Sequence, residues 1–278
     1  MRREQARVEV SLAAIHAAAG EHTQALPLRE TAIATMRSLV ADFPARVVYR
    51  LELDLMLYDL SVERQQAGDT PGAIAADTEA TAGHEQLLAA HPAGHEYASE
   101  LAIVVHHRGY LQTKTDDAAA GRDFTRAAEL IEGVVQKRPD DLSFRLQAGP
   151  MVRAAAIRAA RSEHWHDARD MFRRAVEHVE RVRIAGGKRA AAAKRLLLQM
   201  LPQLAHSELM CDDFAGVVAA LRHQHTVEPM QPEALRELGG EMHVEDRADF
   251  QELLRAAVAA APASQGDGGK QSAACSPW

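Results

Sequence analysis

Histidines are the side chains of this 278-residue sequence most suited to binding a metal or exchanging a proton near neutral pH, and there are fourteen. The closely spaced ones are His164 and His166, His223 and His225, His106 and His107, and His91 and His95. A helical zinc site needs two histidines four residues apart on one face, with a carboxylate or thiolate. Neighbours one or two residues apart point in different directions on a helix, and a proline separates His91 from His95. We therefore expect surface histidines, no metal site and no cofactor.

The motifs of nucleotide-binding and hydrolytic enzymes are also incomplete or absent in this sequence. A kinase needs HRD and DFG elements, but His107-Arg108-Gly109 lacks the aspartate and Asp213-Phe214-Ala215-Gly216 fits an ordinary helix start. Gly186-Gly187-Lys188-Arg189 lacks the upstream glycine and the Ser/Thr of a phosphate loop. The sequence contains no GxSxG, HExxH or EF-hand motif. We therefore expect no catalytic residues and no enzymatic activity.

Composition indicates the kind of fold that positions these residues. Hydrophobic residues make up 47% of the chain but aromatic residues only 4%, and alanine alone supplies 54 positions. Alanine with Leu, Glu, Arg and Gln is a mixture of good helix formers. A β-sandwich or barrel would need more Val, Thr, Tyr and Phe. The composition therefore predicts an all-α protein whose helices approach closely through small side chains.

Net charge and cysteine content indicate which kinds of partner and which cellular compartment to expect. The net charge is −7 with a pI near 6.1, which argues against a general nucleic-acid or membrane-surface binder. Cys211 and Cys275 form neither a disulfide framework nor a CxxC site, so a reducing compartment is expected. The first residues do not resemble a secretory signal, and no apolar run approaches 18 residues. The sequence thus predicts a cytoplasmic protein that binds neither nucleic acid nor membrane.

An internal repeat of about 48 residues is the main organising pattern. A turn signal followed by a small residue recurs as Gly20-Glu21 then Ala25, Gly68-Asp69 then Ala73, Thr115-Asp116 then Ala120, and Glu163-His164 then Ala168. Nineteen residues after each alanine comes Pro44, Pro92, Pro139 or Gly187. Between these marks apolar residues follow a period of 3.6. Each repeat is therefore predicted to be two antiparallel helices, which must stack on neighbouring pairs to bury their apolar stripes.

The pattern predicts a right-handed α-solenoid of about five antiparallel helix pairs with a C-terminal capping helix. Residues 1–229 are expected to hold the repeats, residues 230–261 a capping region, and residues 262–278 a disordered tail. We place helices near residues 3–19, 22–42, 46–67, 71–90, 94–114, 117–138, 141–161, 165–184, 189–208, 213–225 and 247–260. Gly121 could interrupt the sixth helix, and Pro150 and Pro202 should kink the seventh and ninth.

A small residue, a turn, an alanine on the next helix and a terminal proline together resemble the tetratricopeptide repeat (TPR). The best copy runs from Pro92 through Tyr97 to Leu101-Ala102 and on to His107-Arg108-Gly109-Tyr110-Leu111. It is similar to the long-helix repeats in the C-terminal region of planctomycete-type bacterial serine/threonine kinases. Asp246–Leu254 resembles an Arg-x-Asp-Phe closing segment of the same proteins. The period exceeds the common 34 residues, and alanine replaces most aromatic signature positions.

The TPR resemblance implies a concave groove lined by the first helix of each pair. Anchored on Gly109, the groove residues would be Asp59, Glu63, His106, Tyr110, Arg158 and Arg161. The leading hypothesis is a non-catalytic scaffold that binds a partner protein or peptide in this groove. One alternative is a regulatory module of a larger kinase whose catalytic domain is absent from this chain. A second alternative is a helical enzyme that binds a ligand or metal.

Two charged runs leave a further choice open. The segment from Arg173 to Arg195 contains eight Lys/Arg residues and two acidic residues. The segment from Glu208 to Asp249 contains ten acidic residues and three arginines. The basic run could recognise an acidic partner segment, or both runs could be solvated helix faces. Aromatic residues are not interleaved with the basic ones, as single-stranded nucleic-acid binding would need.

Overall fold

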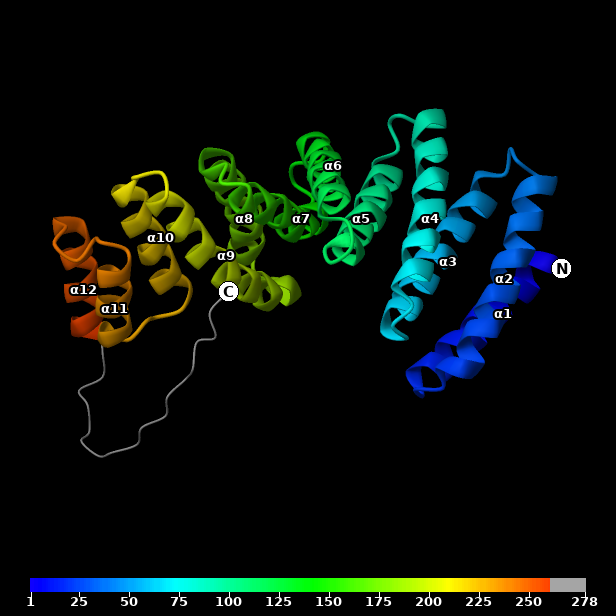
Figure 1. Cartoon of the computed structure of the whole chain (residues 1–278), viewed down its shortest axis with the longest axis horizontal. Coiled ribbons are helices and arrows are strands. Elements are labelled where there is room, and N and C mark those ends of the chain that lie inside the picture. Colours follow the sequence, from blue (N-terminus) through cyan, green and yellow to red (C-terminus); the bar gives the residue numbers. More distant parts are fainter. Residues whose placement is uncertain (261–278) are drawn as a thin grey trace. The chain divides into compact units, whose positions relative to one another are not determined.

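The computed structural model describes residues 1–260 and confirms an all-α fold, with no strand among those residues. One short 3-10 turn, Gly187–Arg189, precedes α9. The α-helices are α1 (Arg2–Ala18), α2 (His22–Asp42), α3 (Val47–Gln66), α4 (Thr70–Ala90), α5 (His95–Gln112), α6 (Asp117–Lys137), α7 (Leu142–Arg161), α8 (Trp165–Ala185), α9 (Ala190–Leu209), α10 (Phe214–Val227), α11 (Pro232–Glu241) and α12 (Ala248–Ala260). Figure 1 shows α1 to α8 as successive helix pairs.

Most predicted helices lie within two residues of the observed ones, with two differences. The expected break at Gly121 is wrong, because α6 runs unbroken through it. The sequence pattern also missed α11, a ten-residue helix with Pro232 in its first turn. Pro150 and Pro202 lie inside α7 and α9 as expected.

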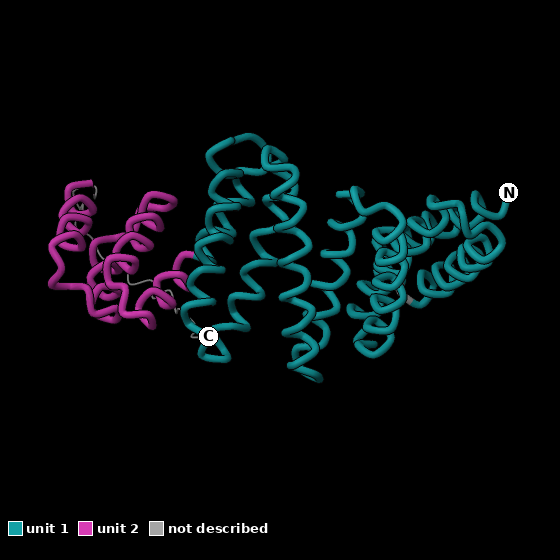
Figure 2. Tube along the Cα trace, turned by 90° about the horizontal axis from the view of Figure 1, so that it is seen from above, with its two compact units in different colours: residues 1–200 teal, residues 201–278 magenta. Residues whose placement is uncertain are grey.

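The described part of the chain divides into two compact units, one within residues 1–200 and one within residues 201–260 (Figure 2). The division falls within α9. The predicted repeat region 1–229 and capping region 230–261 stay predictions, because compactness does not test which residues belong to the repeat. The predicted tail, residues 262–278, lies outside the described residues.

Caps explain why each pair turns where it does. Gly20 and Gly68 adopt φ of +78° and +82° after α1 and α3, a conformation that glycine reaches without steric cost. Asp69 and Asp116 then begin the following helices, their carboxylates accepting hydrogen bonds at 2.9 Å from the backbone N–H groups of Gly72 and Ala119. In the fourth pair Glu163 takes the left-handed conformation, with φ of +60°.

The periodic alanines are the small residues at which paired helices meet. Ala25, Ala73, Ala120 and Ala168 are all buried, as the repeat predicted. Each lies in the first turns of the second helix of its pair. A larger side chain there would separate the two helices, since protein interiors are packed without spare volume.

Stacking of pairs gives the unit of residues 1–200 its core. We call α1, α3, α5 and α7 the first helices and α2, α4, α6 and α8 the second helices. Each first helix packs on its own second helix, and α3, α5 and α7 also pack on the second helix of the preceding pair. Leu57 on α3, for example, is completely buried within a cluster that includes Ile33 and Met36 of α2. Every internal first helix is therefore covered on two sides.

The second unit has a separate core. Val217, Leu221, Leu235 and Phe250 belong to one buried cluster drawn from α10, α11 and α12. A Cβ added to Gly239 would lie 2.3 Å from the Phe250 ring, so the aromatic ring packs directly on the α11 backbone. Phe250, part of the proposed Arg-x-Asp-Phe segment, thus has a structural role in this unit.

Replacing either of two helical glycines by alanine should change the free energy of unfolding, in opposite directions for the two positions. A Cβ on Gly149 of α7 would lie 2.2 Å from the Val179 side chain of α8, whereas one on Gly133 of α6 meets nothing within 4 Å. Gly149→Ala should therefore lower the free energy of unfolding by about 1–3 kcal/mol through overpacking. Gly133→Ala should raise it by about 0.5–1 kcal/mol through helix propensity. Urea denaturation of both variants checks this. A stabilising Gly149→Ala would show that α7 and α8 pack less closely than described.

Candidate partner-binding site

The exposed side of the first helices carries three of the six predicted groove residues. Asp59 on α3, Tyr110 on α5 and Arg161 on α7 are all exposed, and Tyr110 is 59% exposed. Leu55, one turn before Asp59, is also exposed. Allowing for the repeat period, these residues occupy one side of successive first helices. We call Leu55, Asp59, Tyr110 and Arg161 the outward row.

Glu63 lies between helices rather than on the outward row. It is buried, and its carboxylate accepts two hydrogen bonds from Arg29 of α2, at 2.8 Å from Nε and 2.5 Å from Nη2. Arg29 is equally buried and also donates from Nη1 to Asp59 at 3.1 Å. A paired and buried carboxylate is costly to separate from its partner. Glu63 therefore joins α2 to α3, and only Asp59 of this group meets solvent.

Arg158 is likewise engaged within the fold. Its guanidinium donates to both carboxylate oxygens of Asp117 at the start of α6, and this pair lowers the pKa of the Asp117 carboxyl. Arg161, one turn further along α7, is exposed. The two arginines that the sequence placed together in the groove therefore differ: Arg158 holds a neighbouring helix and Arg161 meets solvent.

His106 is half-buried, with its ring centroid 5.5 Å from that of Phe124. Burial lowers the pKa of His106 to about 4, so the ring is neutral at physiological pH. It can offer a partner a neutral hydrogen-bonding ring but no charge.

His107 belongs to a polar cluster that the sequence did not identify. Its Nδ1 lies 2.8 Å from Asp77 Oδ2, its Nε2 lies 3.1 Å from Gln65 Oε1, and its ring packs edge-on against Tyr58. Ser61 lies 3.4 Å from the same Nδ1. A nucleophilic serine would need the opposite ring nitrogen and access to substrate, but Ser61 is buried and donates to the Ala73 carbonyl at 3.0 Å. The cluster is therefore suited to joining α3, α4 and α5.

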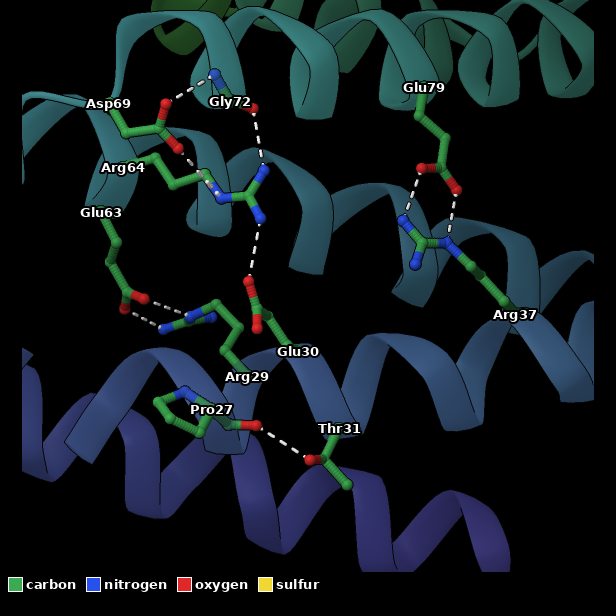
Figure 3. A network of polar contacts seen from close by, with 10 residues as sticks. All are labelled: Pro27, Arg29, Glu30, Thr31, Arg37, Glu63, Arg64, Asp69, Gly72 and Glu79. Carbon is green, nitrogen blue, oxygen red and sulfur yellow. Dashed lines mark hydrogen bonds and ion pairs between the residues drawn. The ribbon is translucent and has the colours of Figure 1, made fainter. Parts of the chain in front are cut away.

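Ion pairs between consecutive second helices recur at equivalent positions. Arg37 of α2 binds Glu79 of α4 through two hydrogen bonds, at 2.8 and 2.6 Å (Figure 3). Glu85 of α4 pairs with Arg126 of α6 at 2.5 Å. Glu132 of α6 pairs with Arg174 of α8 at 2.8 Å. We call these three contacts the inter-repeat ion pairs.

The inter-repeat ion pairs do not all have the same polarity, that is, the same order of charges along the chain. In the pair between α2 and α4 the arginine belongs to the earlier helix, whereas in the other two pairs it belongs to the later helix. The repeat could have identified these pairs from the sequence: residues 37, 85 and 132 keep the period, as do residues 79, 126 and 174. Each pair joins oppositely charged residues 41 or 42 positions apart. The signal is weak in isolation, because most charges on a helix face water.

Three pockets of the first unit lie between second helices, and a fourth, of about 590 Å³, lies at the α6–α7 turn beside Arg189. Volumes of about 340, 680 and 820 Å³ occupy the α2–α4, α4–α6 and α6–α8 crevices. The α4–α6 crevice has apolar walls that include Leu88, Leu130 and Val134, with Glu129 and Lys137 among its lining residues. Arg158 lines the α6–α8 crevice together with Asp117. These crevices are separate from the outward row.

Inside the second pair, Asp54 and His84 are completely buried. Burial raises the pKa of Asp54 to about 7, although Arg50 Nε lies 3.1 Å from Asp54 Oδ1. Burial lowers the pKa of His84 to about 4. Neither side chain reaches solvent, so Asp54 and His84 affect the stability of the fold and do not act on a ligand.

Metal sites and membrane spans are not found in the part of the chain that the structure describes. Among those residues, no group of three or more His, Cys, Asp or Glu side chains could hold a metal ion. No helix within residues 1–260 is long and apolar enough to cross a membrane. No protein-family model matches the sequence, and no curated protein matches it either.

Solved structures with a similar chain path are numerous, and 79 chains match. BtubC from P. vanneervenii is 14% identical and has a TM-score of 0.45, with 92% of this chain and 99% of that chain covered. A thermophilic TPR protein from Thermus thermophilus is 14% identical at a TM-score of 0.34 (91% and 99% covered). A tetratricopeptide repeat protein from Parabacteroides merdae is 12% identical at 0.38 (92% and 99% covered). At such identities and scores, these structures indicate nothing about what this chain binds.

Asp54 should make stability depend on pH. The folded state keeps the Asp54 proton up to about pH 7, while the unfolded chain releases it near its ordinary pKa of about 4. The contribution of protonated Asp54 to the free energy of unfolding is therefore lost as pH rises from about 4 to 7. His84 acts in the opposite sense, because its stability is lost as pH falls from about 6.5 to 4.

Asp54→Asn should consequently stabilise the protein by roughly 2–3 kcal/mol more at pH 8 than at pH 5. Denaturant titrations at the two pH values measure the difference, with Asp140→Asn on the exposed α6–α7 turn as the control. Equal effects of Asp54→Asn at both pH values would contradict the burial of an ionisable Asp54.

Proposed function

We propose that this chain is a non-catalytic, cytoplasmic scaffold whose outward row binds a segment of a partner protein. The observation that carries the proposal is the exposure of Tyr110. A tyrosine with 59% of its surface exposed contributes little to the core, and aromatic side chains are enriched where proteins bind partners. Leu55 adds a second exposed apolar side chain on the same side of the first helices.

Charge along the outward row suggests the chemistry of the partner. Asp59 lies at the α3 end, Tyr110 in the middle and Arg161 at the α7 end. An extended or helical peptide would fit with a basic residue near Asp59, an apolar residue on Tyr110 and an acidic residue near Arg161. Glu63 and Arg158 take no direct part in this proposal, because their side chains are largely covered and bound by Arg29 and Asp117. Asp59 also accepts a hydrogen bond from Arg29, but its side chain stays 55% exposed. His106 supplies a neutral edge beside the row.

A second candidate is the regulatory module of a larger bacterial serine/threonine kinase. It rests on the similarity of Asp246–Leu254 to the closing segment of such proteins. In the fold, Arg247 donates to both Asp249 oxygens at 3.0 Å and Phe250 is buried, so the segment also has a purely structural explanation. An upstream reading frame carrying HRD and DFG motifs would favour this candidate, and its absence would remove it.

Site-specific photo-crosslinking tests the scaffold proposal. A benzoylphenylalanine placed at Tyr110 should form an adduct with one partner protein in cells, identified by mass spectrometry. The same group at Ile184 of α8, which is 71% exposed, is the control and should not capture that partner.

Charge reversal then tests the outward row directly. Asp59→Lys combined with Arg161→Glu should weaken binding of the identified partner at least about tenfold, a loss of about 1.4 kcal/mol. Arg195→Glu, an exposed arginine on α9, should leave the affinity unchanged. Unchanged affinity in the double variant, or capture of the partner equally at residues 110 and 184, would contradict the proposal.

A further inference from the structure

The α4–α6 crevice differs from the two neighbouring crevices in having an apolar floor. Leu88 of α4 and Leu130 of α6 are partly buried against a cluster that contains the buried Leu101 of α5, and all three residues line the crevice. The α6–α8 crevice is larger, but most of its lining residues are polar or charged. The α2–α4 crevice has half the volume of the α4–α6 crevice. Of the three crevices, the one between α4 and α6 therefore suits an apolar group best.

A small residue on α5 keeps this crevice open. Allowing for the repeat period, Ala98 of α5 corresponds to Arg50 of α3 and to Arg145 of α7. Both arginines reach the second helix of their own pair, because Arg50 lies directly against Gly83 of α4 and Arg145 Nη1 lies 3.3 Å from His178 Nδ1 of α8. Ala98 therefore leaves empty the space that a long side chain occupies in the pairs before and after it.

A glycine enlarges the same crevice from the α6 side. Gly133 corresponds to Gln86 of α4 and to Arg181 of α8, and a Cβ added to Gly133 would meet no atom within 4 Å. Glycine inside a helix is destabilising relative to alanine, and Gly133 has no positive φ that would require it. Nothing in the described fold needs a glycine at this position, so the space beside Gly133 is available to a ligand.

Charges at the two ends of the crevice have opposite sign. Its lining residues that can carry a charge are Glu85, His95, Arg126, Glu129 and Lys137. Glu85 and Arg126 neutralise each other through their ion pair. Glu129 and Lys137 are both exposed, and neither forms an ion pair with a described residue. They lie four residues before and four residues after Gly133, which puts all three on one stripe of α6, about 12 Å long.

His95 does not cancel this separation of charge. It is the first residue of α5, and α6 returns along α5, so the start of α5 and the end of α6 lie at the same end of the pair. Protonation of His95 would therefore add positive charge at the Lys137 end. The crevice thus combines an apolar floor with a negative end at Glu129 and a positive end at Lys137.

We propose that the α4–α6 crevice binds a helix of a partner protein, oriented antiparallel to α6. An acidic residue of the partner helix meets Lys137. Four residues later, a large apolar side chain enters the space beside Gly133 and Leu130, and after four more residues a basic side chain meets Glu129. This spacing matches the stripe on α6, because both helices rise 1.5 Å per residue.

An antiparallel helix suits this crevice for two reasons. Insertion of an apolar helix face into an apolar groove is a common mode of peptide recognition, with anchor residues one helical turn apart. The antiparallel direction also puts the acidic residue towards the N-terminus of the partner helix and the basic residue towards its C-terminus, as the helix dipole favours. The crevice shares no residue with the outward row, so the two proposals can fail independently.

NMR titration of the isotope-labelled full chain with three synthetic, alanine-based helical peptides tests the proposal. The matched peptide carries Glu, Leu and Arg at positions i, i+4 and i+8. The swapped peptide carries Arg, Leu and Glu at the same positions, and the neutral peptide carries Gln, Leu and Gln. The matched peptide should shift the amide signals of Gly133 and Ala98. It should bind at least about threefold more tightly than the neutral peptide, and the swapped peptide should bind most weakly.

Variants of the chain test the position of the site. Gly133→Leu should fill the crevice and abolish binding of the matched peptide at about 1 mM, while circular dichroism shows an unchanged helical fold. Gly240→Leu is the matched control, because a Cβ at this α11 glycine also meets nothing within 4 Å, and it should leave binding unchanged. Glu129→Lys combined with Lys137→Glu should reverse the preference, so that the swapped peptide binds more tightly than the matched one.

Several results would overturn the proposal. They are the absence of matched-peptide binding at about 1 mM, equal affinities for the matched and swapped peptides, and binding that survives Gly133→Leu. Equal affinity for the neutral peptide would show an apolar site without charge recognition, which contradicts the assigned partner. Shifts of the Gly133 signal that follow the concentration of the chain alone would show that a second copy covers the crevice instead.

Discussion

The first unit depends on one packing constraint: each internal first helix is buried between its own second helix and the second helix of the preceding pair. A helix pair exposes an apolar stripe that it cannot bury alone. Small residues such as Ala73 and Ala120 let the two helices of a pair approach closely, which leaves the larger aliphatic residues to fill the space between pairs. Stability in such an array comes mainly from contacts between neighbours, so a defect in one pair weakens the next.

Polar contacts supplement this packing and join neighbouring helix pairs. The buried contact of Arg29 with Glu63 joins α2 to α3, and the inter-repeat ion pairs join successive second helices. Because the first inter-repeat ion pair has the opposite polarity from the other two, stacking the third or the fourth pair on the first would place Arg37 against Arg126 or Arg174. Exposed ion pairs add little stability individually. Their reversed polarity instead disfavours incorrect stacking.

These internal contacts also determine which surfaces are available for function. Glu63, Arg158 and His107 are bound within the fold, whereas Tyr110 and Arg161 are exposed. The outward row is one surface that these internal contacts leave exposed.

Sequence patterns predicted the helices well because turns and close contacts need particular residues. Gly68 and Asp69 end α3 and begin α4 for reasons of local backbone conformation and capping, and both can be read without tertiary information. The short helix α11 was missed because its ten residues are too few to show a clear helical period and include Gly239 and Gly240 near its end. The candidate site was harder to predict, since successive residues on a helix differ in direction by about 100°. Asp59 and Glu63 are one turn apart, yet the first is exposed and the second is buried against Arg29, because packing between elements distant in sequence decides which side of α3 is covered.

Native-state hydrogen exchange tests the packing constraint most directly. Amides in helices that are covered on two sides should exchange only when the whole first unit unfolds. Amides in a helix that is covered on one side can exchange when that helix alone unfolds. We predict that the central amides of α1 exchange well ahead of those of α3, α5 and α7. Protection of α1 equal to that of α5 would contradict the account, because coverage by a preceding helix would then not be what stabilises the first helices.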